Sequence, residues 1–111
     1  MARISIIGSG YVGSSVGKWL QNTGNSIIFY DINNETIKNL ADEGYNATND
    51  IKKTIQETDI SFICVPTPTK DGKIDLSYIK AATEAVANEL KNKSSYHLIV
   101  VITLQVQRAT P

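Results

Sequence analysis

A glycine-rich turn between two apolar runs constrains this chain more than any other feature. Residues 4–7 (Ile-Ser-Ile-Ile) are typical of a strand, and residues 8–13 (Gly-Ser-Gly-Tyr-Val-Gly) follow directly. A second apolar run, residues 27–30, ends at Asp31. A strand, a Gly-x-Gly-x-x-Gly turn, a helix and a second strand that ends in a carboxylate together predict a dinucleotide site, although the glycine pattern alone is weak evidence.

Each glycine of the turn has a separate physical role. Gly8 allows a sharp turn out of the strand, because a residue without Cβ adopts dihedral angles closed to others. Gly10 leaves room for a pyrophosphate near the backbone, and Gly13 lets the helix pack closely on the strand. Since a helix N-terminus offers free N–H groups and partial positive charge, we expect the amides of Tyr11 and Val12 to be the nearest phosphate donors.

Asp31 has two candidate roles. Its carboxylate can accept hydrogen bonds from both hydroxyls of the adenosine ribose, and it would repel a 2′-phosphate, which favours NAD over NADP. Alternatively, Asp31 caps the next helix together with Asn33 or Asn34. The complete fingerprint favours the ribose role.

Composition limits the class of protein. With 111 residues the chain is at most one domain, residues 1–111, and its 11 basic and 11 acidic residues cancel, so no nucleic-acid or membrane partner is indicated. The N-terminal apolar run is too short for a signal peptide, and no run approaches the length of a membrane span. The single cysteine excludes an internal disulfide and fits a reducing compartment, so we expect a cytoplasmic protein.

Apolar periodicity predicts alternating strands and helices, hence a Rossmann-like doubly wound parallel α/β sheet of about five strands. In the first helix, Val12, Val16, Trp19 and Leu20 are expected to share the buried face. Residues 66–73 are expected to be a loop with an Asp-Gly turn, and Asp75 to cap the following helix. The expected strands are 3–8, 26–31, a short one in 45–48, 59–65 and 98–102, and the expected helices are 11–23, 34–42, a brief one after Asn49 and one after Asp75.

The run Val65-Pro66-Thr67-Pro68-Thr69 falls at the carboxyl end of a central strand, where open α/β sheets bind ligands. Because the two prolines restrict the backbone to extended shapes, they would hold the Thr67 hydroxyl rigidly toward a cofactor. A stiff connection without a ligand is the alternative. Local chemistry does not separate the two.

Three segments together resemble the UDP-glucose/GDP-mannose dehydrogenase family: residues 4–13, 62–69 and 71–78. The resemblance covers roughly residues 2–102, and it implies NAD-dependent oxidation of a nucleotide-sugar C6 alcohol to a carboxylate through a cysteine thiohemiacetal and thioester. It also implies that Gly8, Gly10, Tyr11, Val12, Gly13, Asp31 and Thr67 contact NAD, and we include the adjacent Val65 and Pro66 as cofactor-binding candidates.

The chain departs from the family pattern in three places. Residues 41–59 are too few for a segment that the family normally carries there, and residues 103–111 lack the expected Ser-Thr-Val-Pro motif. The family's catalytic cysteine, its partners and the sugar-binding domain lie beyond this point. We therefore expect a domain that is incomplete at the C-terminus, atypical over 103–111 and inactive alone, without catalytic or metal-binding residues.

Two residues could be mistaken for catalytic groups. Cys64 lies in an apolar strand without a basic neighbour, so a buried, inert thiol is expected. His97, the only histidine, is expected at an exposed strand entrance because no partner is identifiable.

Alternative functions remain open at this point. The chain could be a non-catalytic interaction or regulatory module, or the N-terminal domain of another NAD-dependent dehydrogenase acting on a hydroxy acid or sugar phosphate. A UDP-sugar partner is expected only for a full-length parent. The apolar run Leu98 to Leu104 predicts an open sheet edge and self-association through it.

Overall fold

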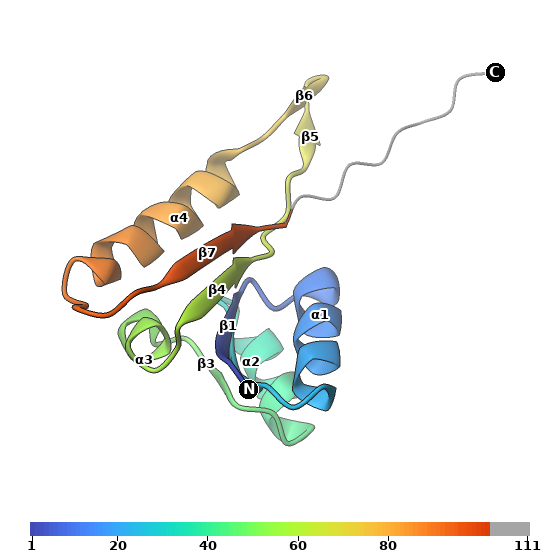
Figure 1. The fold of residues 1–111 in the computed structure, drawn as a ribbon. Helices are drawn as coiled ribbons and strands as arrows, with labels where there is room; N and C mark the ends of the chain where they lie inside the picture. Colours follow the sequence, from blue (N-terminus) through green and yellow to red (C-terminus); the bar gives the residue numbers. More distant parts are fainter. Residues whose placement is uncertain (103–111) are drawn as a thin grey trace.

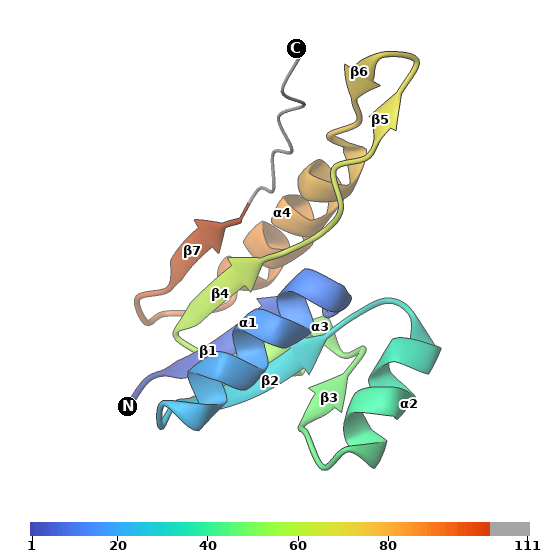
Figure 2. The same cartoon turned by 90° about the vertical axis from the view of Figure 1, so that its right-hand side faces the viewer.

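The computed structural model describes residues 1–102 (Figure 1). Its main feature is a five-stranded parallel sheet of order β3-β2-β1-β4-β7, whose strands are labelled in Figure 2. This topology confirms the predicted doubly wound fold. The strands of this sheet are β1 (Arg3–Ile7), β2 (Ser26–Tyr30), β3 (Ala47–Thr48), β4 (Ile60–Ile63) and β7 (Leu98–Val101). The helices are α1 (Tyr11–Asn22), α2 (Asn34–Asp42), α3 (Ile51–Gln56) and α4 (Ser77–Leu90).

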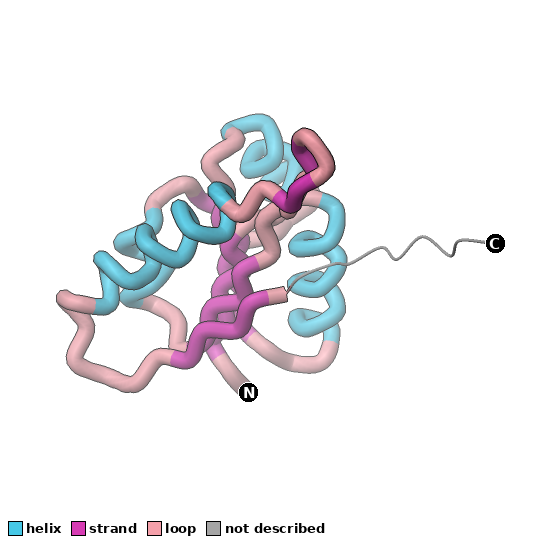
Figure 3. Tube along the Cα trace, turned by 90° about the horizontal axis from the view of Figure 1, so that it is seen from above, coloured by secondary structure: helices cyan, strands magenta, loops and turns pink. Residues whose placement is uncertain are grey.

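Helices cover both faces of the sheet, as Figures 2 and 3 show. Successive strand residues point to opposite faces, so Ile6 packs toward α1 and α2 while Ile7 packs toward α3 and α4. Strands that are buried on both sides read as the continuous apolar runs seen in the sequence. The buried residues on the first side are Ile4, Ile6, Ile27, Phe29 and Leu40, and those on the second are Ile7, Ile55, Ile63 and Val86.

Two glycines bring α1 close to the sheet. A Cβ on Gly17 would lie 2.3 Å from Phe29 Cε1, so only glycine allows this approach. The expected buried face is wrong for Trp19, whose side chain is 65% exposed. The reason is that Gly13 and Gly17 form the centre of the contact face, and Trp19 lies roughly 120° from Gly13 around the axis.

A small hairpin extends from the body after β4. The expected loop contains β5 (Thr69–Lys70) and β6 (Lys73–Ile74), which pair antiparallel (Figure 1). Asp71 and Gly72 both have positive φ, 53° and 76°, as a tight Asp-Gly hairpin turn requires. The turn is confirmed, whereas strands of two residues are too short to be recognised from sequence.

The start of α4 differs by one residue from the expectation. Its N-cap is Leu76, which makes no side-chain cap bond. The Asp75 carboxylate instead accepts the Ser77 N–H at 2.9 Å. It therefore binds the first N–H of the helix from the position before the N-cap.

Within the described residues, β7 forms one edge of the sheet. Its Leu98 and Val101 side chains are 41% and 46% exposed. The rest of the expected apolar run, to Leu104, and the whole 103–111 segment lie outside the described residues. In the part of the chain that is described, no helix has the length and apolar character needed to cross a membrane.

Candidate dinucleotide site

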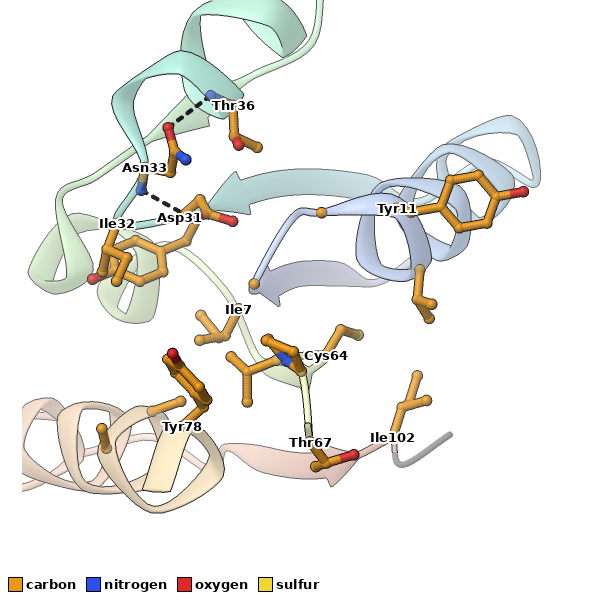
Figure 4. A pocket seen from close by; sticks show the side chains of 18 of the residues that line it. Ile7, Tyr11, Asp31, Ile32, Asn33, Thr36, Cys64, Thr67, Tyr78 and Ile102 are labelled. Carbon is orange, nitrogen blue, oxygen red and sulfur yellow. Dashed lines mark hydrogen bonds between the residues drawn. The ribbon is translucent and has the colours of Figure 1, made fainter. Parts of the chain in front are cut away.

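A cavity of about 790 Å³ opens at the carboxyl ends of β1, β2 and β4, with α4 along one side (Figure 4). Its size is that of sites for small ligands and cofactors. Of the nine sequence-predicted site residues, eight line it: Gly8, Gly10, Tyr11, Val12, Asp31, Val65, Pro66 and Thr67. The topology thus brings together three segments that are far apart in sequence. Their contacts with NAD stay a prediction.

The glycine turn leads directly from β1 into α1. Gly8 has φ +92°, a left-handed conformation that favours glycine, and its N–H donates to the Tyr30 carbonyl at 3.0 Å. A Cβ on Gly10 would have no atom within 4 Å, so the space above this residue is open. No side chain caps α1 and its first turn holds no acidic residue, so no residue of the helix itself offsets the partial positive charge of its N-terminus.

Gly13 is the one predicted site residue that does not line the cavity. A Cβ there would lie 1.9 Å from the Gly8 carbonyl oxygen and 3.1 Å from Ile6 Cγ2. Gly13 therefore holds the first turn of α1 against the end of β1, the close packing expected from the sequence.

The Asp31 carboxylate lies at the end of β2 and holds two backbone amides. Oδ2 accepts the Ser9 N–H at 2.9 Å, and Oδ1 accepts the Asn33 N–H at 2.9 Å. The cap of α2 is Asn33, whose Oδ1 accepts the N–H groups of Glu35 and Thr36. Because each carboxylate oxygen can accept a second hydrogen bond, Asp31 retains capacity for two ribose hydroxyls.

The electrostatics of the cavity wall are simple. Among the described residues that line it, Asp31 is the only charged side chain, and none is Lys or Arg. Burial raises the pKa of the neighbouring Tyr30 phenol, and the Asp31 charge raises it further, so this hydroxyl stays neutral. Phosphates would therefore be held by backbone amides, and a 2′-phosphate near Asp31 would meet no cation.

Residues 65–68, which include Pro66 and Pro68 and which we call the proline loop, form another side of the cavity. A Cβ on Gly8 would lie 2.9 Å from Val65 Cγ1, which shows how closely this loop meets the glycine turn. The Cys64 N–H donates to the Ile7 carbonyl at 2.8 Å, which ties the loop to the end of β1. The Cys64 thiol is half-buried and lines the cavity, whereas a fully buried thiol was expected. Partial burial raises its pKa to about 11, so the thiol stays protonated near neutral pH.

Part of the cavity wall was not predicted from the sequence. Ile32 directly follows Asp31 and is 81% exposed, an unusual position for an isoleucine that only the structure reveals. Tyr78 lies across the cavity at the start of α4 (Figure 4). Small residues of α4 recur at helical spacing after it, which was a readable signal. The missed lining residues include Ile32, Asn33, Thr36, Tyr78, Ala81, Ala82, Ala85 and Ile102.

A second polar cluster lies at the amino end of the sheet, and it corrects the expectation for His97. His97 Nε2 lies 2.8 Å from Ser61 Oγ, and its Nδ1 lies 3.0 Å from Lys93 Nζ. Ser61 Oγ lies 2.7 Å from Ser5 Oγ, and Lys93 also donates to the Ile55 and Thr58 carbonyls. His97 is thus half-buried and has partners, which we name the His97 cluster: Ser5, Ser61, Lys93 and His97.

The charge state of the His97 cluster follows from its contacts. Burial and the Lys93 cation lower the pKa of His97, and burial lowers the pKa of Lys93. Since Lys93 donates to Nδ1, the neutral ring carries its proton on Nε2 and donates to Ser61. The cluster therefore satisfies its own groups at the end of the sheet opposite the cavity. No group of three or more His, Cys, Asp or Glu within residues 1–102 could hold a metal.

Comparison with known proteins identifies relatives of this chain. Residues 2–46 and 38–109 match the NAD binding domain of the UDP-glucose/GDP-mannose dehydrogenase family. The two matched ranges overlap at residues 38–46, in α2 and the following loop. This overlap adjoins the region where the chain is expected to lack a segment that family members carry.

Two relatives and two solved structures illustrate the similarity. UDP-glucose 6-dehydrogenase of Haloferax volcanii is 33% identical over 96% of this chain and 29% of its own length. GDP-mannose 6-dehydrogenase of Pseudomonas aeruginosa is 32% identical over 89% of this chain and 28% of its own length. A ternary complex of the Pseudomonas aeruginosa GDP-mannose dehydrogenase superposes with a TM-score of 0.84 at 32% identity, covering 89% of this chain and 28% of that one. A UDP-glucose dehydrogenase of Pyrobaculum islandicum superposes with a TM-score of 0.81 at 28% identity. The match covers 91% of this chain and 28% of that one.

These relatives bear on both the fold and the cofactor of the chain. The chain spans less than a third of the length of each relative named above. The chain belongs to the UDP-glucose/GDP-mannose dehydrogenase family as its NAD binding domain, and its cofactor is NAD.

Proposed function

We propose that residues 1–111 form one domain that binds NAD in the cavity at the carboxyl end of the sheet. The residues proposed to contact it are Gly8, Gly10, Tyr11, Val12, Asp31, Val65, Pro66 and Thr67, with Gly13 supporting the turn. In this proposal the first-turn amides of α1 bind the pyrophosphate, and Asp31 accepts the hydroxyls of the adenosine ribose.

One observation carries this proposal: the glycine turn, Asp31 and the proline loop meet around one cavity. Among the described residues of its wall, Asp31 is the single anionic group. The open space above Gly10 and the uncapped N-terminus of α1 fit a pyrophosphate. The Asp31 carboxylate fits ribose hydroxyls and disfavours a 2′-phosphate, which supports NAD over NADP.

The proposed activity is that of the relatives' class, the NAD-dependent oxidation of a nucleotide-sugar at C6. NAD would accept the hydride, and this domain would hold and orient the cofactor. The chain alone is proposed to be inactive, because its single cysteine, Cys64, has a raised pKa and lies among apolar residues. A UDP- or GDP-sugar partner is therefore proposed only for a protein that carries further domains.

The cofactor site is tested by calorimetric titration of the chain with NAD⁺ and NADP⁺, together with Asp31→Ala. We expect NAD⁺ to bind more tightly than NADP⁺, and D31A to weaken NAD⁺ about tenfold or more, since hydrogen bonds to a charged group are lost. The preference for NAD⁺ over NADP⁺ should shrink in the same variant. Equal binding of both cofactors by the unmodified chain would contradict the site.

We also propose that the chain self-associates through β7. The edge position of this strand and the exposure of Leu98 and Val101 support the proposal, because an open apolar edge favours pairing with another strand. Light scattering over a concentration series should show dimers or larger species, and Val101→Lys should reduce them. A monomer at every concentration would contradict it.

A further inference from the structure

Ser9 lies inside the glycine turn but does not line the cavity. Its side chain is 2% exposed, and it lies between two glycines of which the first adopts a positive φ. A buried hydroxyl in such a turn needs a hydrogen-bond partner, because an unpaired polar group away from water is costly.

The partners of Ser9 lie at the ends of two neighbouring strands, β1 and β2. Its Oγ donates to the Tyr30 carbonyl at 3.0 Å and lies 3.3 Å from the Ile6 carbonyl. Its N–H donates to Asp31 Oδ2 at 2.9 Å. Ser9 thus connects the glycine turn to the ends of β1 and β2 and to the carboxylate at the end of β2.

These contacts exclude a direct role of Ser9 in holding phosphate. Its amide is committed to Asp31, and its hydroxyl is enclosed by strand carbonyls. Any effect on a ligand must therefore pass through the shape of the turn. A turn with glycine on both sides is intrinsically flexible, so a fixed hydrogen bond at its centre restricts the position of the amides that follow.

We propose that Ser9 is a positioning residue that fixes the distance between the pyrophosphate-binding amides of α1 and the Asp31 carboxylate. This inference rests on the proposed NAD site. A ligand that contacts both the α1 amides and the Asp31 carboxylate needs them at a fixed distance, whereas a ligand that contacts Asp31 alone does not. The hydroxyl of Ser9 therefore contributes to the affinity for NAD more than to the affinity for adenosine.

The test compares Ser9→Ala with Ser61→Ala. Ser61 is a matched control because its hydroxyl is also fully buried and hydrogen-bonded, but in the His97 cluster at the opposite end of the sheet. The dissociation constants for NAD⁺ and for adenosine are measured by NMR titration, and stability by urea unfolding. Ser9→Cys, which retains the side-chain size but donates weakly, serves if S9A does not fold.

We expect S9A to weaken NAD⁺ binding about tenfold and adenosine binding less than about twofold, while S61A changes neither by more than about twofold. S9C should weaken NAD⁺ in the same direction by a smaller factor. An equal loss for both ligands in S9A, unchanged NAD⁺ affinity, or failure of both Ser9 variants to fold would overturn the positioning role. Failure of the unmodified chain to bind NAD⁺ would instead overturn the proposed site itself, and this inference with it.

Discussion

The two ends of the same sheet use polar groups in opposite ways. At the carboxyl end, Asp31 and the first turn of α1 border a cavity and keep capacity for further hydrogen bonds. At the amino end, the groups of the His97 cluster bind one another and nearby carbonyls. Both ends hold buried serine hydroxyls, so burial of polar residues alone does not distinguish a binding site from a structural contact.

The difference lies in what surrounds the polar groups. Glycine at position 10 leaves open space beside the turn, and small side chains of α4 leave room opposite it. At the amino end, the long side chain of Lys93 reaches two backbone carbonyl groups and the His97 ring. A polar group beside open, apolar-walled space is available to a ligand, whereas one with all partners supplied by the chain contributes to stability.

Gly13→Ala should have the largest effect, because it acts on both fold and site. The added Cβ would lie 1.9 Å from the Gly8 carbonyl oxygen, a backbone atom that cannot turn aside. We expect the free energy of unfolding to fall by about 3 kcal/mol, as in severe over-packing, and NAD⁺ binding to disappear. Urea unfolding and calorimetry measure the two effects. A stable variant that binds NAD⁺ normally would show that α1 can move away from the turn without consequence.

Gly10→Ala should weaken NAD⁺ binding while leaving the stability of the fold nearly unchanged. Its Cβ meets no atom within 4 Å and the backbone φ of −71° suits alanine. The free energy of unfolding should change by less than about 1 kcal/mol, because weaker capping and a less flexible unfolded chain act in opposite directions. The methyl group would occupy the proposed pyrophosphate position, so NAD⁺ should bind at least about tenfold more weakly. Unchanged affinity would mean that the phosphates bind elsewhere.

Lys93→Met should show the reverse pattern. The variant keeps an apolar stem but removes the cation that binds the Ile55 and Thr58 carbonyls and His97 Nδ1. We expect the free energy of unfolding to fall by about 1–2 kcal/mol, since hydrogen bonds from a charged group are lost at a partly solvated site. The NAD⁺ dissociation constant should stay the same within about twofold. A large change in affinity would show that the two ends of the sheet are coupled.

The sequence predicted the carboxyl end far better than the amino end. The glycine turn is a local motif, and parallel strands necessarily bring their carboxyl ends to one edge, so Gly8, Asp31 and Thr67 could be placed near one another in advance. The His97 cluster depends on contacts between residues 36 and 56 positions apart, which no local pattern encodes. The exposure of Trp19 is not evident from the sequence for a related reason. The side of α1 that faces the sheet is determined by the close contact of Gly17 with Phe29, which is distant in sequence.

The smallest expected effect is a dependence of stability on pH that arises from His97. Burial and the Lys93 cation lower the pKa of His97, while the Thr58 carbonyl and the Asp59 carboxylate oppose this change. An unfolded chain would take up the proton near pH 6.5, before the folded protein does. The free energy of unfolding should therefore be constant above about pH 6.5 and fall as the pH decreases toward the lower, folded pKa.

The contribution of His97 is measured by urea unfolding between about pH 5 and about pH 8, where it can be separated from the other titrating groups at this end of the sheet. The hydrogen bond from Arg3 lowers the pKa of Asp59 below its ordinary 3.8, so Asp59 stays ionised throughout this range. His97→Gln should remove the decrease below pH 6.5 while leaving the NAD⁺ affinity unchanged. The decrease should be shallow, because solvent reaches the half-buried ring and screens the Lys93 charge. If H97Q showed the same pH profile as the unmodified chain, the proton taken up on unfolding would belong to another group, and His97 would not determine the pH dependence.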